Sequence, residues 1–164
     1  MTEQTWQQRV DAVWADESLT PDETITAIDR LAAERSADDA VALFERGGAR
    51  DSAGREADAE GLYRRALELG LDDERRTRCV IQLASTIRNL GKVDEALALL
   101  RVEYERDPGT PMNDAAAAFY ALALVSAGEP DRAASVALRA LAPHLPRYTR
   151  SVRGYAEEIV DEHA

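Results

Sequence analysis

The sequence predicts an all-α protein built from antiparallel helix pairs, and two observations predict it. Hydrophobic residues make up 45% of the 164 residues but aromatic residues only 5%, and alanine supplies much of the apolar content. Alanine is the best helix former, whereas sandwiches and barrels are rich in β-branched and aromatic residues. A constant spacing of 37 residues links Gly54, Gly91 and Gly128. Such a period is typical of repeated helical hairpins.

An alanine follows each of these glycines after the same interval, at Ala59, Ala96 and Ala133. Each glycine predicts the end of a helix, because glycine readily adopts the left-handed conformation that stops one. Each alanine predicts a second helix packed closely on the first, because its small side chain lets two backbones approach. We therefore expect every repeat to be one helix pair.

Apolar residues at helical spacing predict the first helix of each pair, upstream of each glycine. These residues are Val41 and Phe44 in the first repeat, Val80, Leu83, Ala84, Ile87 and Leu90 in the second, and Phe119, Leu122, Ala123 and Val125 in the third. The first repeat also places Gly47 and Gly48 inside its helix. Each costs about 1 kcal/mol relative to alanine, so we expect a close backbone contact at this point.

Further helices are expected to cover the two ends of the stack, as repeat arrays require. Near the front, Thr20 and Glu23 predict a capping box, with Pro21 at the first helical position. The apolar residues expected to pack the terminal helix onto the last repeat are Tyr148, Val152, Tyr155 and Ile159.

This pattern of small residues, glycine, alanine and a closing proline resembles the tetratricopeptide repeat. The residues that carry the resemblance are Gly47, Gly54, Ala59, Tyr63 and Ala66 in the first repeat and Leu83, Ala84, Gly91, Ala96 and Pro108 in the second. The match covers roughly residues 28–160, and it is similar to a small bacterial family of these repeats without an established activity. The resemblance implies a right-handed superhelix of antiparallel helix pairs with about nine helices.

We expect a single domain over residues 1–164. Its expected parts are an N-terminal capping helix pair at 1–35, three repeats at 36–71, 72–108 and 111–144, and a C-terminal capping helix at 145–162.

The net charge of −11 is concentrated in the front half of the chain. Residues 1–37 carry −5, with eight acidic and three basic side chains, and residues 38–74 carry −6, with eleven acidic and five basic. This acidity repels nucleic acid and anionic lipid, so neither is an expected partner. The longest nearly uncharged stretch, 115–128, is too short to cross a bilayer, and the first ten residues do not resemble a secretory leader. We expect a cytoplasmic protein.

Groups suited to catalysis or metal binding are scarce in this sequence. Cys79 is the only cysteine, and its apolar neighbours in a repeat helix predict a packed structural thiol. The two histidines, His144 and His163, have no cysteine near them in the sequence and no position suited to acid–base chemistry. We therefore expect no catalytic residue, no metal, no cofactor and no enzyme activity.

Polar residues in the first helix of each repeat form the candidate ligand site, because the resemblance implies that these helices line a concave groove. The candidates are Arg78, Gln82, Ser85, Arg88 and Asn89 in the second repeat and Asp51, Ser52 and Arg55 in the first. A planar guanidinium binds two oxygens at once, so Arg88 with Asn89 suits a peptide backbone or a carboxylate. Alternatively, Arg88 pairs with Asp51 and joins two repeats. The sequence leaves both interpretations open.

These features favour an adaptor that binds a peptide or protein segment in the groove. A self-associating homodimer is the alternative, because the alanine-rich third repeat and the aromatic terminal helix could offer an apolar surface to a second copy. An enzyme is the remote alternative, since the sequence contains no nucleophile–base pair, phosphate loop or metal-ligand spacing.

Overall fold

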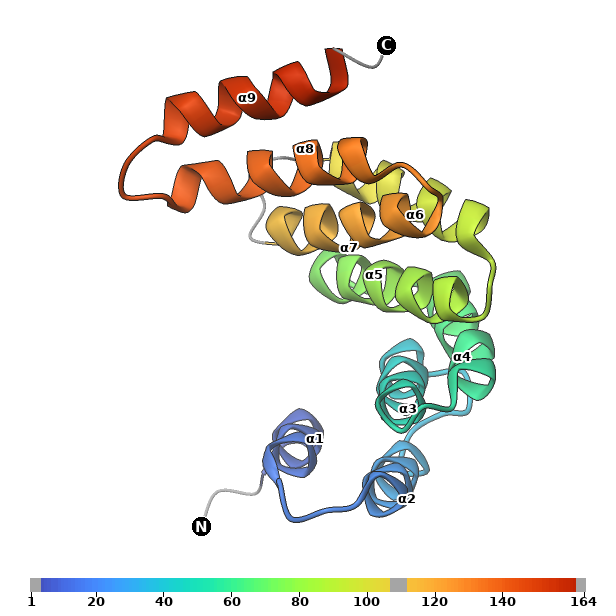
Figure 1. Ribbon diagram of the computed structural model, residues 1–164. Helices are drawn as coiled ribbons and strands as arrows, with labels where there is room; N and C mark the ends of the chain where they lie inside the picture. The colour runs from blue at the N-terminus through green and yellow to red at the C-terminus, as the bar shows by residue number, and fades with distance from the viewer. Residues whose placement is uncertain (1–3, 107–111, 162–164) are drawn as a thin grey trace. The chain divides into compact units, whose positions relative to one another are not determined.

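The computed structural model describes residues 4–106 and 112–161, and this part of the chain folds into nine α-helices and one short 3-10 helix, with no strand. The predicted all-α fold of repeated helix pairs is confirmed (Figure 1). The helices are α1 Trp6–Ala15, α2 Pro21–Ala32, α3 Ala40–Ser52, α4 Glu56–Leu69, α5 Asp73–Asn89, α6 Val93–Arg106, α7 Asn113–Ser126, α8 Pro130–Leu141, the 3-10 helix η1 Ala142–His144 and α9 Thr149–Asp161. Pro108 and His163 lie outside the described residues.

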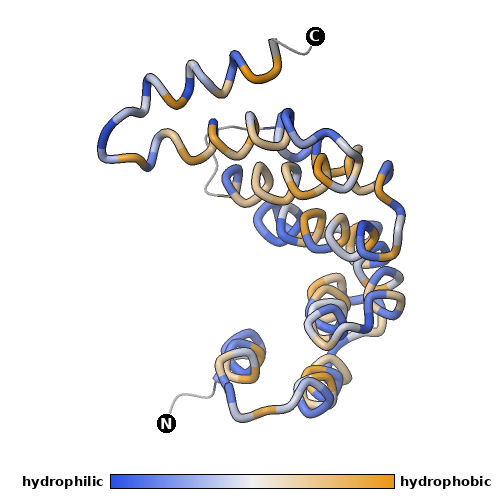
Figure 2. Tube along the Cα trace, viewed as in Figure 1, coloured by the Kyte–Doolittle hydropathy of each residue, from blue (hydrophilic) through white to orange (hydrophobic). Residues whose placement is uncertain are grey.

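The chain divides into two compact units, Met1–Thr86 and Ile87–Ala164. The first unit contains α1 to α4 and most of α5, and the second contains the end of α5 and α6 to α9. Within each unit, helices that follow one another in the sequence pack together, as α3 does with α4 and α7 with α8. Apolar and polar residues alternate along most helices (Figure 2), as expected where one face is buried and another meets water.

The three spaced glycines end their helices as predicted. Gly54, Gly91 and Gly128 have φ of 71°, 83° and 81°, in the left-handed region that glycine tolerates best. In each turn, the amide after the glycine donates to the carbonyl five residues earlier, as Lys92 does to Ile87 at 2.9 Å. This hydrogen bond satisfies a carbonyl at the helix end. The three alanines that follow are buried, so the predicted close packing of the second helices is confirmed.

Capping residues fix where several helices begin. The Thr20 hydroxyl accepts a hydrogen bond from the Glu23 amide at 3.3 Å, and the Glu23 carboxylate accepts one from the Thr20 amide at 2.9 Å. The predicted capping box is therefore present, and Pro21 occupies the first position of α2. Asp39 caps α3 through a 2.8 Å bond from the Ala42 amide. Each cap satisfies amides that have no partner within their own helix.

A close contact does occur at Gly47, but its partner differs from the one predicted. A β-carbon at this position would lie 2.7 Å from two ring atoms of Tyr63, on α4. The prediction of a close backbone contact was therefore wrong: the glycine makes room for an aromatic side chain. The Tyr63 ring is fully buried, with its centroid 6.2 Å from that of Phe44.

The second unit has its core along α7. Tyr120 on α7 stacks with Tyr104 on α6, with ring centroids 5.4 Å apart and an interplanar angle of 28°. Leu124 is fully buried, whereas Leu122 and Val125 are 47% and 57% exposed. Leu122 and Val125 helped to predict this helix, and they lie on a different face of α7 from Tyr120 and Leu124.

The terminal helix α9 packs on α8 through small residues. The Ser135 hydroxyl donates a 2.5 Å hydrogen bond to the carbonyl of Ala156, and both residues are buried. Tyr148 and Tyr155 are 74% and 63% exposed. The predicted packing face was therefore wrong for both tyrosines: α9 turns Ala156 toward the last repeat instead.

Candidate ligand-binding surfaces

Three predicted site residues of the first unit share one face of α5. Arg78, Gln82 and Ser85 are spaced by four and three residues, which places their side chains along one helical stripe. Arg78 is exposed, and its guanidinium carbon lies 5.4 Å from the centre of the Phe44 ring on α3. Gln82 and Ser85 are half-buried. The ring holds the guanidinium by a cation–π contact and leaves its edge open to water.

Gln82 carries an unusual side-chain oxygen. Its Oε1 is buried and has no hydrogen-bond partner among the described residues. An unpaired buried acceptor costs about 1–3 kcal/mol relative to one that is satisfied. Because this oxygen has almost no surface open to solvent, a donor from outside the protein would reach it only if the Gln82 side chain turned outward.

The predicted site residues of the first repeat make internal contacts instead. Asp51 accepts hydrogen bonds from the hydroxyls of Thr86 at 2.9 Å and Tyr63 at 3.5 Å. Burial raises the pKa of the Asp51 carboxyl, and the neighbouring Glu56 charge adds to the rise in pKa, whereas the bond from Thr86 opposes it. Ser52 donates to a carbonyl of its own helix, and Arg55 pairs with Asp22 at 2.7 Å.

Arg88 and Asn89 close α5 at the start of the second unit. The Arg88 guanidinium donates to the Ser126 hydroxyl at 3.5 Å and to the Asn89 side-chain oxygen at 3.2 Å. Its Nε is buried without a hydrogen-bond partner among the described residues. Within their own units, Asp51 and Arg88 therefore each have other hydrogen-bond partners.

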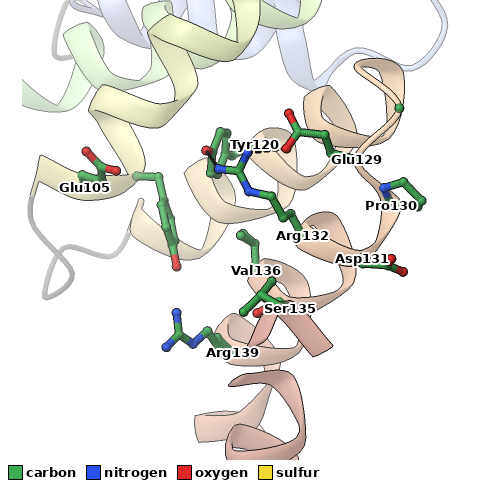
Figure 3. Close-up of a pocket in the computed structure, with 12 residues that line it drawn as sticks. Glu105, Tyr120, Glu129, Pro130, Asp131, Arg132, Ser135, Val136 and Arg139 are labelled. Carbon is green, nitrogen blue, oxygen red and sulfur yellow. Dashed lines mark hydrogen bonds and ion pairs between the residues drawn. The ribbon is translucent and has the colours of Figure 1, made fainter. Parts of the chain in front are cut away.

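The second unit contains two adjoining hollows that the sequence did not predict. Their volumes are about 580 and 470 Å³. The side chains that line both are Tyr104, Glu105 and Arg139. Figure 3 shows the larger hollow, where Arg132, Ser135, Val136 and Arg139 of α8 lie in succession opposite Glu105. One feature of the sequence could have indicated the larger hollow: Arg132 and Arg139 are two turns apart and lie on one face of their helix.

Ion pairs hold both arginines of this wall in place. Arg132 pairs with Glu129, which raises the pKa of the guanidinium, and it also donates to the Tyr120 hydroxyl at 3.4 Å. Arg139 pairs with Glu157 of α9 at 3.2 Å. Because both guanidinium groups already have a carboxylate, the larger hollow has no strong preference for an anion.

Comparison with protein families decides what kind of protein this is. Residues 40–159 match the family described as "Tetratrico peptide repeat", which is well over half of the chain. The protein belongs to the tetratricopeptide repeat family. This membership confirms the resemblance seen in the sequence and indicates a scaffold for protein–protein interaction. No curated protein matches the chain.

The reactive groups of this tetratricopeptide repeat protein are few. Cys79 is fully buried, which raises the pKa of its thiol to about 12, and its sulfur donates to the Tyr63 carbonyl at 3.6 Å. A thiol with such a pKa is a poor nucleophile at neutral pH. Exposed His144 contacts Asp114 at 2.9 Å. Across residues 4–106 and 112–161, no three His, Cys, Asp or Glu side chains come together to hold a metal ion. None of the helices described there has the length and apolar character needed to cross a membrane.

Proposed function

We propose that this protein is an adaptor that binds a peptide or protein segment along the α5 stripe, defined as Arg78, Gln82 and Ser85. The observation that carries the proposal is the buried, unpaired oxygen of Gln82, one helical turn from the exposed guanidinium of Arg78. A polar group left without a partner in a folded protein costs free energy, and a bound donor would recover it.

The stripe offers complementary contacts to an extended segment. Gln82 can accept a backbone N–H, and Arg78 can donate to a backbone carbonyl or a carboxylate. The Phe44 ring beneath Arg78 holds the guanidinium in place, so less side-chain entropy is lost on binding. In the second unit, Arg88 and Asn89 offer the same two kinds of group, and we propose that they bind in the same way.

The proposal assigns no reaction to the chain. It is supported by the family, whose members are typically interaction modules without catalytic activity, and by the inert environment of Cys79.

Site-directed cross-linking tests this proposal. Because Cys79 is buried, a Ser85→Cys variant would carry one reactive thiol, which can be labelled with a photoreactive maleimide. Irradiation in lysate should attach a partner to this variant, and mass spectrometry would identify it. The matched control is Ala57→Cys, at an exposed position of α4. The proposal is wrong if both variants attach the same proteins equally.

A second experiment tests the residues themselves. Arg78→Ala combined with Gln82→Ala should reduce affinity for the identified partner about tenfold or more, whereas Arg30→Ala on α2 should not change it. Circular dichroism should show the same helix content in all three proteins. Unchanged affinity in the double variant would remove the α5 stripe as the site.

Self-association is a second candidate function, and one observation favours it. Leu122 and Val125 are both largely exposed on one face of α7. Burying this face against a second copy would remove apolar surface from water. Sedimentation of the wild type and of the double variant Leu122→Ser, Val125→Ser at micromolar concentration tests this candidate function. If both proteins sediment as monomers, α7 forms no such interface.

A further inference from the structure

The larger hollow of the second unit combines aromatic rings with arginine side chains. Tyr104 of α6 and Tyr120 of α7 contribute the rings, and α8 contributes Arg132, Val136 and Arg139 (Figure 3). Its volume of about 580 Å³ lies within the usual range for ligand sites in proteins, about 300–1,000 Å³. No residue of the α5 stripe lines this hollow, so the proposed function leaves it without a role.

The two tyrosines form a stack that is closed on one side. Tyr120 is only 4% exposed, and the Tyr104 ring stacks on it with centroids 5.4 Å apart. Tyr104 is half-buried and lines both hollows, so part of its side chain beyond the contact with Tyr120 borders the open space. A third ring could extend this stack, because aromatic rings attract one another when their centroids are about 4.5–7 Å apart.

The two guanidinium groups of α8 are held in place but not covered. Arg132 pairs with Glu129 and donates to the Tyr120 hydroxyl at 3.4 Å, and Arg139 pairs with Glu157 at 3.2 Å. Both arginine side chains are nevertheless about half exposed. A guanidinium held in this way can pack its flat face on an aromatic ring while its N–H groups keep the carboxylate.

The charges around the larger hollow favour a neutral ligand. An anion would have to compete with Glu129 or Glu157 for the arginines. A cation could pair with Glu105, but it would then lie opposite the two guanidinium groups of α8 (Figure 3). A neutral aromatic ring meets neither cost.

We propose that the larger hollow binds an aromatic side chain of a partner protein, with tryptophan preferred. The ring lies between Tyr104 and the guanidinium groups of α8, and it contacts Val136 and Val160, which also line the hollow. Tryptophan is the best cation–π partner among the aromatic residues, and its N–H can donate to the Glu105 carboxylate. This site is separate from the α5 stripe and does not depend on it.

The open rim of the hollow favours a side chain of a peptide over a free small molecule. Glu105, Arg132 and Arg139 line the hollow and are each about half exposed, whereas small-molecule sites usually bury about 70–90% of their ligand. A side chain can fill the inner part while its backbone stays outside and forms hydrogen bonds with the exposed rim. The family of the chain, which indicates a protein-interaction scaffold, agrees with such a ligand.

Nuclear magnetic resonance titration of the full-length protein tests this site. The probes are three acetylated and amidated pentapeptides, Gly-Ser-Xaa-Ser-Gly, in which Xaa is Trp, Leu or Lys. The tryptophan peptide should cause saturable amide shift changes at Tyr104, Tyr120 and Val136, and it should bind at least about fivefold more tightly than the leucine peptide. Tighter binding of the lysine peptide would reject the site in favour of one for cations, and the absence of saturable changes at these amides would reject it outright.

Tyr104→Leu separates ring stacking from burial of apolar surface, because leucine keeps an apolar side chain. This variant should bind the tryptophan peptide about fivefold or more weakly, whereas Tyr104→Phe should bind it as the wild type does. Tyr155→Leu is the matched control, because Tyr155 is 63% exposed and lines neither hollow. Wild-type affinity in Tyr104→Leu would overturn the proposed stacking.

Arg139→Gln gives a test that leaves the stacked tyrosines intact. It should weaken binding of the tryptophan peptide about two- to fivefold and leave the leucine peptide unaffected. Arg150→Gln, at an exposed position of α9 that lines neither hollow, should change neither affinity. If Arg139→Gln binds both peptides as the wild type does, the guanidinium makes no contact with the ring. Arg78→Ala combined with Gln82→Ala should leave this binding intact, so failure of the α5 proposal and failure of this one give different results.

Discussion

The Thr86 hydroxyl donates a 2.9 Å hydrogen bond to Oδ1 of Asp51 and so joins α5 to α3 within the first unit. The same hydroxyl lies 2.8 Å from the Gln82 carbonyl, which is a second acceptor for its one proton. A protonated Asp51 would resolve this competition, because the acid could donate to Thr86 while Thr86 donates to the carbonyl. The raised pKa of Asp51 is consistent with this arrangement.

The first prediction is a pH dependence of stability that Asp51 causes. Burial raises the pKa of Asp51 in the folded state, so the folded protein holds this proton more tightly than the unfolded chain does. As the pH rises from the ordinary carboxyl pKa through the raised one, the contribution of Asp51 to the free energy of unfolding therefore falls. Asp51→Asn should remove this contribution, because its amide can donate to Thr86 at every pH.

Urea unfolding at a series of pH values between 4 and 7 checks this prediction. The variant should gain stability relative to wild type as the pH rises. Asp58→Asn, at an exposed position of α4, is the control and should show no such trend. A constant difference between Asp51→Asn and wild type would contradict the assignment.

Gly47 and Gly61 predict opposite effects of the same substitution. In Gly47→Ala the new β-carbon would lie 2.7 Å from the buried Tyr63 ring, which cannot move without disturbing Phe44. We expect a net loss of about 1–2 kcal/mol, because overpacking outweighs the gain in helix propensity. In Gly61→Ala nothing lies within 4 Å of the new atom, so the free energy of unfolding should rise by roughly 0.5–1 kcal/mol. Thermal and urea unfolding measure both, and a stabilised Gly47→Ala would disprove the contact.

The sequence was most informative where local chemistry decides the structure. The spaced glycines, the buried alanines and the Thr20 capping box all follow from conformational preferences of single residues, and all three were predicted. The packing direction of α7 and α9 depends on which neighbour each helix meets. Tyr155 was expected to pack on the last repeat for this reason, because helical spacing identifies an apolar stripe but not what lies opposite it.

In the candidate sites, too, the sequence predicted what depends on one helix and missed what depends on contacts between helices. Helical spacing placed Arg78, Gln82 and Ser85 on one stripe, as the structure has them. Helical spacing could not reveal that the Asp51 carboxylate accepts hydrogen bonds from Thr86 and Tyr63, because those contacts join residues far apart in the sequence. The hollows of the second unit were missed for a related reason: their walls come from α6, α7, α8 and α9 together.

Trp14 gives a third prediction, which concerns the N-terminal helix. Its indole N–H donates a 2.8 Å hydrogen bond to Glu45, a carboxylate on α3 that is only 6% exposed. Trp14→Phe keeps an aromatic ring but removes this donor from a buried charge, which should cost about 1–3 kcal/mol. Chemical denaturation followed by circular dichroism measures the loss. Adding Glu45→Gln should recover part of it, because an amide is less costly than a carboxylate to leave unpaired; no recovery would mean that the ring packing, and not the hydrogen bond, is what Trp14 contributes.

Gln82 gives the last prediction, in which stability and binding change in opposite directions. Gln82→Leu removes a buried oxygen that has no partner and puts an apolar side chain of similar length in a half-buried position. The free energy of unfolding should therefore rise by roughly 1 kcal/mol. If Gln82 accepts a hydrogen bond from a bound segment, the same variant should bind the cross-linked partner about tenfold more weakly. Ser85→Ala, on the same stripe, serves as the comparison for binding without this gain in stability. A variant that is more stable and still binds normally would mean that Gln82 faces no ligand, whereas a less stable variant would mean that its amide has a partner in solution.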